Sequence, residues 1–154
     1  MAIGEYTKAI EVNPDYASAY AHRGWSYYKL GQHQNARKDY TKAIQLDPDD
    51  ASAYNIRGIS YKELGQYQLA IDDYTMAIQL DPDFAKPYNN RGNVYRILGQ
   101  YQLAIDDATK AIQIEPNATR YYNRAATYRE LGQWSLSAAD EAKVCSLDKR
   151  YSYC

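Results

Sequence analysis

The sequence predicts an all-α fold, a solenoid of antiparallel helix pairs, and three observations lead to it. A block of 34 residues recurs along almost the whole chain, and residues 64–73 reappear letter for letter as residues 98–107. Within each block, apolar residues return at three- and four-residue steps, the spacing of an amphipathic helix. A short break divides each block into two such segments. A repeat of this length is typical of proteins built from stacked helical units.

The elements are expected in the following order. Residues 1–14 match the second helix of a unit, as comparison with residues 37–48 shows. Helix pairs follow, and in the first pair the helices are expected over residues 17–30 and 33–46. The expected units are a half repeat at 1–14, repeats at 15–48, 49–82, 83–116 and 117–150, and a tail at 151–154.

Glycine and proline mark the ends of these helices. A glycine followed by glutamine separates the two helices of each pair, where a left-handed C-terminal cap costs other residues more. These glycines are Gly31, Gly65, Gly99 and Gly132. Proline cannot continue a helix, so the second helices should end before the closing prolines of the units. These are Pro14, Pro48, Pro82 and Pro116.

A second row of small residues lies inside the first helices, where glycine costs about 1 kcal/mol relative to alanine. The row is Gly24, Gly58, Gly92 and Ala125. Close approach of a neighbouring helix would offset that cost, and we predict it here.

Tyrosine, glycine and alanine also return at fixed offsets, and a proline closes each unit. In the first full unit these residues are Tyr20, Gly24, Tyr27, Gly31, Ala36, Tyr40, Ala43 and Pro48. On this pattern the chain resembles the tetratricopeptide repeat (TPR) family, over essentially all 154 residues. The resemblance implies a right-handed superhelical solenoid whose first helices line a concave groove that receives a peptide. It specifies a scaffold, and only weakly a function.

Every repeat carries an arginine on its first helix and an aspartate on its second. The pairs are Arg23 with Asp39, Arg57 with Asp73, Arg91 with Asp107, and Arg124 with Asp140. In other TPR proteins the site of this arginine is often apolar and turned inward. Because an unpaired buried charge is expensive, we predict that an Arg–Asp bridge joins the two helices of each repeat.

The fourth repeat is one residue short. Gly132 follows Gly99 by 33 residues, whereas the earlier glycines of this row are 34 apart. The deletion is expected in the turn between repeats, where residues 82–85 (PDFA) become residues 116–118 (PNA). We predict a local change in stacking angle at this turn.

The two ends of the array differ. The half repeat keeps the interior pattern of Tyr6, Ala9, Ile10 and Val12 without its first helix. Either the chain is a fragment of a longer array, or this face docks on a second copy, because large uncovered apolar patches mark interaction sites. At the other end Glu141 stands in a tyrosine row and Lys149 replaces the closing proline. Both suit the polar outer face of a capping repeat, so the array should end near Arg150.

The composition limits the classes of partner and the cellular location that we expect. The formal net charge is -1 and the pI is about 6.1, which argues against nucleic-acid and anionic-membrane partners. There is no apolar run of about eighteen residues and no signal-peptide pattern in residues 1–10. A cytoplasmic location follows as the default expectation.

No catalytic constellation is visible in the sequence. His22 and His33 lie in different predicted helices, and no nucleophile, phosphate-binding or zinc-protease motif accompanies them. His33 takes the place of Tyr67, Tyr101 and Trp134, which favours a packing role or partial exposure. We therefore expect no enzyme, no cofactor and no metal site.

The two cysteines, Cys145 and Cys154, give neither metal-ligand spacing nor a disulfide framework. Cys145 falls in the row that Ile44, Ile78 and Ile112 occupy, which predicts a packing role.

The positions that match the groove of the family carry many asparagines. Three neighbouring rows read Ala21, Asn55, Asn89 and Tyr122; His22, Ile56, Asn90 and Asn123; and Trp25, Ile59, Asn93 and Ala126. An asparagine side chain donates and accepts hydrogen bonds at once, which suits the main chain of an extended peptide. The alternative is that these amides only solvate a concave surface.

The next row reads Tyr28, Lys62, Arg96 and Arg129. No acidic residue stands three or four places from these cations on their own helices, so ordinary helix-surface pairing does not occupy them. Together with Lys86 they predict a basic groove and an acidic, carboxylate-bearing ligand. The alternative is a set of solvated surface cations.

Some TPR co-chaperones clamp the C-terminal carboxylates of heat-shock chaperones, and this chain fits that clamp poorly. Its sites would fall on Ala21, Trp25, Ile56, Lys86 and Asn90, of which only Lys86 has the expected chemistry. Shifted by one repeat they fall on Asn55, Ile59, Asn90, Thr119 and Asn123, which match only at Asn90. Trp25 and Tyr28 suggest instead that an aromatic or apolar ligand residue binds at the N-terminal end.

We therefore expect a non-catalytic interaction scaffold for an acidic peptide or protein segment. The rival expectation is a structural or self-associating solenoid that forms homo-oligomers through its exposed terminal helices.

Overall fold

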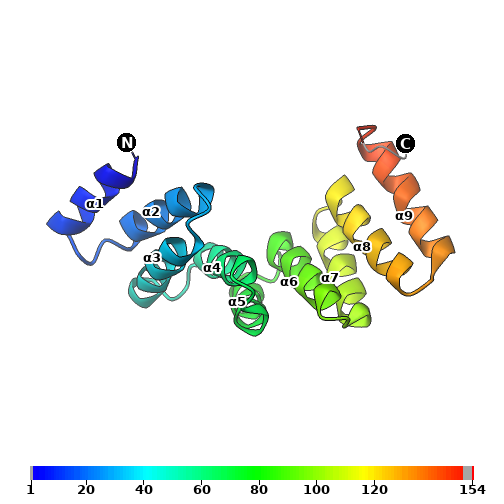
Figure 1. The fold of residues 1–154 in the computed structure, drawn as a ribbon, viewed down its shortest axis with the longest axis horizontal. Helices are drawn as coiled ribbons and strands as arrows, with labels where there is room; N and C mark the ends of the chain where they lie inside the picture. The colour runs from blue at the N-terminus through cyan, green and yellow to red at the C-terminus, as the bar shows by residue number, and fades with distance from the viewer. Residues whose placement is uncertain (1, 151–153) are drawn as a thin grey trace. The chain divides into compact units, whose positions relative to one another are not determined.

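The structure, a computed structural model, describes residues 2–150 and 154 (Figure 1). This part of the chain is all-α, without strands. Its helices are α1 Ala2–Val12, α2 Ala17–Lys29, α3 His33–Leu46, α4 Ala51–Glu63, α5 Tyr67–Leu80, α6 Ala85–Ile97, α7 Tyr101–Ile114, α8 Ala118–Glu130 and α9 Trp134–Leu147. The predicted helical-repeat solenoid is thereby confirmed. Apart from Cys154, the expected tail at 151–154 lies outside the described residues.

The helices gather into two compact units, Met1–Asp81 and Pro82–Cys154. In the first unit α2 pairs with α3 and α4 with α5, while α1 packs on α2 and α3 on α4. In the second unit α6 pairs with α7 and α8 with α9, while α7 packs on α8. The first helices of successive pairs also touch within each unit, α2 with α4 and α6 with α8.

The helix ends follow the glycine and proline pattern. The four glycines between paired helices have positive φ angles of 69° to 73°, the left-handed conformation predicted for them. At the first of these turns the Gly31 N–H donates to the Tyr28 carbonyl at 2.9 Å, and the Gln32 N–H donates to the Tyr27 carbonyl at 2.9 Å. The helices α1, α3, α5 and α7 each end two residues before their closing proline. Both predictions are confirmed.

The row of small residues marks close helix contact, as predicted. A Cβ atom added at Gly58 would lie 2.7 Å from the Tyr74 ring, and one at Gly24 would lie 3.0 Å from the Tyr40 ring. At Gly92 the nearest atom would be the Ala104 carbonyl oxygen, at 3.1 Å. The first helices α2, α4 and α6 therefore lie against their partner helices at these glycines.

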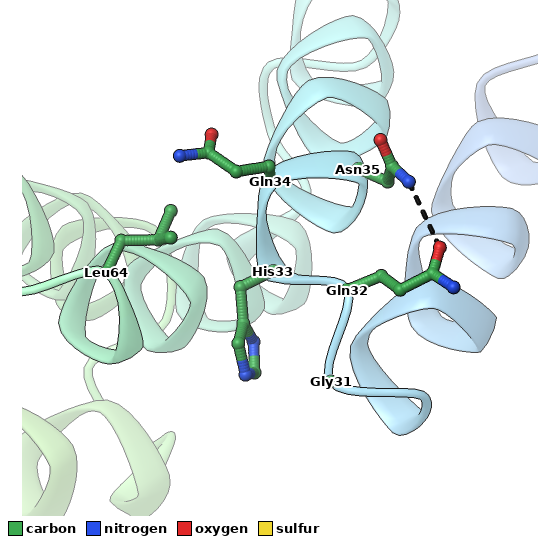
Figure 2. A pocket seen from close by; sticks show the side chains of 6 residues that line it. All are labelled: Gly31, Gln32, His33, Gln34, Asn35 and Leu64. Carbon is green, nitrogen blue, oxygen red and sulfur yellow. Dashed lines mark hydrogen bonds between the residues drawn. The ribbon is translucent and has the colours of Figure 1, made fainter.

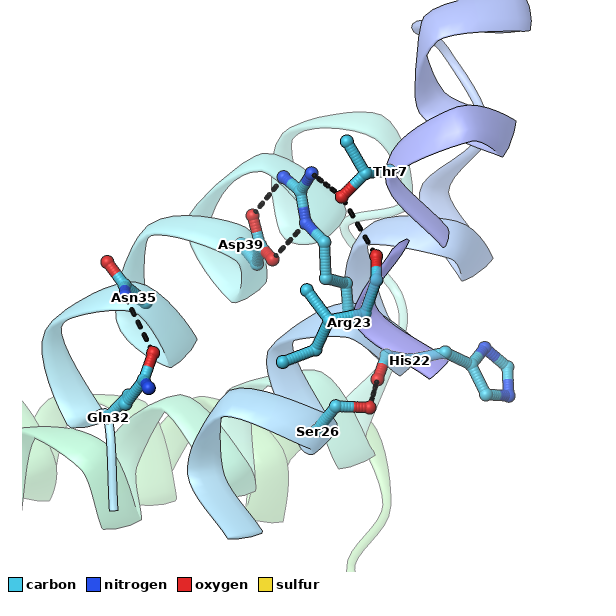
Figure 3. Close-up of polar contacts among 8 residues, drawn as sticks. Thr7, His22, Arg23, Ser26, Gln32, Asn35 and Asp39 are labelled. Atoms are coloured by element: carbon cyan, nitrogen blue, oxygen red, sulfur yellow. Dashed lines mark hydrogen bonds and ion pairs between the residues drawn. The ribbon is translucent and has the colours of Figure 1, made fainter. Parts of the chain in front are cut away.

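The Arg–Asp bridge joins the paired helices in every repeat, which confirms the prediction. Arg23 donates from Nε and Nη2 to the two carboxylate oxygens of Asp39, both at 2.8 Å, and from Nη1 to Thr7 Oγ1 at 3.1 Å (Figure 3). These hydrogen bonds with Asp39 raise the pKa of Arg23 against the opposing effect of burial. The same bidentate contact joins Arg57 to Asp73, Arg91 to Asp107, and Arg124 to Asp140.

Threonine and tyrosine complete this bridge, and neither is predicted from the sequence. The threonine comes from the second helix of the preceding repeat. Arg124 Nη1 donates to Thr109 Oγ1 at 2.9 Å, and Arg23 Nη1 likewise donates to Thr7 Oγ1. The Arg57 guanidinium lies 5.5 Å and 5.8 Å from the ring centroids of Tyr54 and Tyr61, one turn to either side on α4. Arg23, Arg57 and Arg124 therefore contact the second helix of the preceding repeat as well as the second helix of their own repeat.

The missing residue of the fourth repeat lies in the predicted turn. Three residues, 115–117, separate α7 from α8, whereas four residues, 47–50, separate α3 from α4. Asn117 caps α8 by accepting the Arg120 N–H at 3.0 Å. The change in stacking angle at this turn stays a prediction.

The expectation that the two cysteines form no disulfide is wrong. Cys145 near the end of α9 is bonded to Cys154, with Cα atoms 5.4 Å apart. A turn follows α9, in which Arg150 donates from its backbone and its guanidinium to the Asp148 carboxylate. These hydrogen bonds lower the pKa of Asp148 to about 2. Alignment of the repeats places Cys145 in an apolar packing row. It does not predict the bond to Cys154, which lies beyond α9.

Candidate functional site

The candidate site is a first-helix face in each unit. In the first unit it comprises Ala21, His22, Trp25 and Tyr28 on α2, with Asn55, Ile59 and Lys62 on α4. In the second unit it comprises Lys86, Asn89, Asn90, Asn93 and Arg96 on α6, with Tyr122, Asn123 and Arg129 on α8. All but Asn55, which is 4% exposed, are partly or fully accessible to solvent. The contacts of α2 with α4 and of α6 with α8 bring each set together within its unit.

Two asparagines of the second unit form a hydrogen bond with each other. Asn123 Nδ2 on α8 donates to Asn89 Oδ1 on α6 at 2.8 Å, across the contact between these first helices. This bond uses one donor of Asn123 and one acceptor site of Asn89. An asparagine amide has two donors and can accept two hydrogen bonds, so the bond leaves each amide with further capacity.

Two of the three predicted free cations are paired within the chain, which corrects the interpretation of a fully unoccupied basic row. Lys62 Nζ lies 2.9 Å from Glu63 Oε1, and Arg129 Nη1 lies 3.1 Å from Glu141 Oε1. The lysine stem is flexible enough to reach the next residue despite the turn of the helix between them. Glu141 comes from α9, and spacing on the arginine's own helix cannot reveal such a partner.

Glu141 has partners within the chain. Its carboxylate lies 3.1 Å from Arg129 Nη1 on α8 and accepts a hydrogen bond from Ser137 Oγ at 3.1 Å, and its side chain is 27% exposed. Trp134 and Leu136 of α9 are also exposed, at 67% and 49%. The last helix therefore presents large apolar side chains to solvent.

Arg96 differs from the other two cations of its row. Its side chain is half-buried on α6. Its Nε atom is buried, and none of the described residues provides a hydrogen-bond acceptor for it.

Aromatic side chains gather at the first-helix face of the first unit. The rings of Trp25 and Tyr28 stack with centroids 5.3 Å apart, and Tyr28 meets the His33 ring edge-on at 5.9 Å. Lys29 Nζ lies 4.6 Å from the Trp25 ring centroid, a cation–π distance. Trp25 remains 41% exposed, so this cluster offers an aromatic surface with a cation beside it.

A shallow hollow of about 320 Å³ lies beside this cluster, at the turn that starts α3 (Figure 2). Its lining comprises Gly31, Gln32, His33, Gln34, Asn35 and Leu64. Asn35 Nδ2 donates to Gln32 Oε1 at 3.0 Å, and His33 Nδ1 is buried without a partner in the described chain. None of the residues predicted to bind a ligand lines this hollow.

A buried arginine at the shortened turn is the clearest residue that sequence reasoning missed. Arg120 is 4% exposed, donates to the Glu115 carbonyl, and lies 2.7 Å from Glu115 Oε2. It occupies a row that holds Ala19 and Ala53 in the first unit. The exchange of alanine for arginine, next to the deletion, is visible in the sequence once the register is corrected.

Two further properties concern residues 2–150 and 154 only. No helix there is long and apolar enough to cross a membrane. No group of three or more histidine, cysteine, aspartate or glutamate side chains in that part is arranged to hold a metal ion.

Comparison with known families identifies the repeat. A family model described as TPR repeat matches residues 1–31 and 24–65, and one described as tetratricopeptide repeat matches residues 51–84 and 85–118. Among curated proteins, none shows significant similarity to the chain.

Several solved structures share the fold. A crystal structure of MamA is 25% identical, with a TM-score of 0.89 over 99% of this chain and 90% of that one. TTC0263, a thermophilic TPR protein of Thermus thermophilus, is 20% identical, with a TM-score of 0.81 over 96% and 82%. YrrB, described as a TPR protein with an unusual peptide-binding site, is 19% identical, with a TM-score of 0.81 over 97% and 77%. The latter two show likeness of fold alone.

Proposed function

The chain belongs to the tetratricopeptide repeat family, and from this premise we propose that it is a non-catalytic interaction scaffold whose first-helix faces bind an extended acidic segment of a protein. The array in this proposal consists of the half repeat 1–14 and the four repeats that end at 48, 82, 116 and 150. Its setting is the cytoplasm.

The charge of the first helices carries the proposal. Helices α2 and α6 contain no aspartate or glutamate, although the whole chain has 19 acidic residues and a net charge of -1. Helix α6 contributes Lys86 and Arg96 to its face, beside the amides of Asn89 and Asn93. Cations would hold ligand carboxylates by charge-assisted hydrogen bonds, and amides would bond to the ligand main chain.

The internal ion pairs are compatible with this role because they are weak. The side chains of Lys62 and Glu63 are 32% and 42% exposed, and those of Arg129 and Glu141 are 39% and 27% exposed. Exposed pairs contribute about 0 to 1 kcal/mol. A ligand carboxylate can therefore compete with Glu63 for Lys62 and with Glu141 for Arg129.

Binding of a peptide panel tests the proposal. The panel contains acidic, neutral and basic peptides with free and amidated C-termini, at low and physiological salt. We expect salt-sensitive binding of the acidic members, lost when Lys62, Arg96 and Arg129 are all replaced by glutamine. The matched control replaces Lys8, Lys38 and Lys110, exposed cations of the second helices, and should bind as the wild type does. Binding without preference for acidic peptides, or equal loss in both variants, would contradict the proposal.

A second candidate function is self-association through the end helices. Helix α1 has no buried residue, and Val12 is 87% exposed. Together with exposed Trp134 and Leu136 on α9, these side chains are available to a second copy. Light scattering coupled to size exclusion tests this candidate, and a monomeric mass over a wide concentration range would remove it.

A further inference from the structure

Arg96 occupies a position whose equivalents are paired with acids in two other repeats. Lys62 has Glu63 and Arg129 has Glu141, at 2.9 Å and 3.1 Å. No described residue pairs with Arg96, and its Nε atom is buried without an acceptor. The third repeat thus keeps the cation and lacks the acid.

The sequence of the third repeat explains why the acid is missing. Ile97 follows Arg96, where Glu63 follows Lys62. Ala108 on α7 stands in the row of Glu141 on α9, and its side chain is apolar and buried. Both positions that supply an acid to the equivalent cations are therefore apolar around Arg96.

A carboxylate is the chemical group that this arrangement lacks. A buried donor without an acceptor is costly, more so on a charged group, and this cost is removed when the half-buried side chain of Arg96 turns toward a ligand that accepts its hydrogen bond. Guanidinium presents a planar fork of N–H donors that matches the two oxygens of a carboxylate. Asn93 lies three residues earlier on the same side of α6, where its amide can donate to the same ligand.

We propose that Arg96 is the carboxylate-binding residue of the second unit, and that it binds an aspartate or glutamate side chain, or a terminal carboxylate, of the peptide. This inference rests on the proposed function and deepens it. Arg96 is then the cation of this row that anchors the ligand, whereas Glu63 and Glu141 compete with the ligand for Lys62 and Arg129.

Calorimetric titration with defined probes tests the role of Arg96. The probes are a peptide of alternating glutamate and alanine and its glutamine counterpart, each with a free or amidated C-terminus. Arg96→Gln should weaken binding of the glutamate peptide at least about tenfold, the loss of one hydrogen-bonded charge pair. If Arg96 binds side-chain carboxylates, Arg96→Gln should leave binding of the glutamine peptide with a free C-terminus unchanged. If Arg96 binds the terminal carboxylate, the variant should weaken binding of that peptide too.

Three further variants keep the test decisive. Arg129→Gln makes the same charge change at the equivalent site of the next repeat, and should weaken binding much less. Ile97→Glu, at an exposed position, places an acid beside Arg96 as Glu63 lies beside Lys62, and should weaken binding while the guanidinium remains. Glu141→Gln should strengthen binding by releasing Arg129. If Arg96→Gln fails to fold, the Ile97→Glu variant carries the test alone.

The outcomes separate this inference from the proposed function. If the wild type binds no carboxylate peptide, both are overturned. If it binds the glutamate peptide, and Arg96→Gln and Arg129→Gln weaken binding equally, or Ile97→Glu has no effect, the assignment of Arg96 is overturned and the scaffold function stands.

Discussion

Replacing Asp73 with alanine is expected to destabilise the chain by about 3 to 5 kcal/mol, the typical cost of breaking a buried ion pair by removing one partner. Asp73 accepts hydrogen bonds at 2.8 Å and 2.7 Å from Arg57, and the two side chains are only 7% and 15% exposed. The truncation leaves the guanidinium of Arg57 with its charge uncompensated between two helices. Chemical denaturation followed by circular dichroism measures the loss.

A double-mutant cycle isolates this bridge from other effects of the truncation. Arg57→Met should also destabilise, and the double variant should lose less than the sum of the two single losses. Glu63→Gln serves as the control, because it breaks the exposed pair with Lys62 and should cost less than about 1 kcal/mol. Additive losses in the cycle would show that the bridge contributes no coupling.

Gly58→Ala is expected to lower stability by about 1 to 3 kcal/mol, the range for overpacking a tight interior site. The added methyl would lie 2.7 Å from the ring of Tyr74, which is fully buried and has little room to move. This clash exceeds the gain of about 1 kcal/mol that alanine brings to a helix interior. Thermal unfolding of the purified variant measures the net effect.

Gly4→Ala is the matched control for this substitution. A Cβ atom at Gly4 in α1 meets nothing within 4 Å, so only the helix-propensity gain applies and stability should rise or stay unchanged. A stabilised Gly58 variant would refute the close approach of α4 and α5 at this site.

The backbone and the recurring bridge could be predicted because the residues that determine them recur in every repeat. Gly31 and its equivalents determine the turns through their left-handed conformation, which depends on only a few neighbouring residues. Arg23 and Asp39 recur at one spacing in every unit, and an interior charge requires a partner. The tyrosines and threonines around the bridges recur as regularly in the sequence, but their spacing alone does not show that they contact the arginine.

The candidate site was less predictable because its contacts vary between repeats. Glu141 occurs once, on a helix other than that of Arg129, so its pairing depends on how α8 and α9 pack. The bond between Asn89 and Asn123 likewise depends on the approach of two first helices. Such contacts belong to side-chain rotamers and helix packing, which a pattern of spacings does not encode.

The most direct measurement of the central claim is a two-dimensional NMR titration of the labelled chain with the glutamate peptide. We predict that the largest shifts fall on the first-helix faces of α4, α6 and α8, with the Arg96 Nε–H signal among them. Shifts confined to α1 and α9 would contradict the account and place the interaction on the end helices, and shifts confined to α3, α5 and α7 would contradict it by placing the interaction on the second helices.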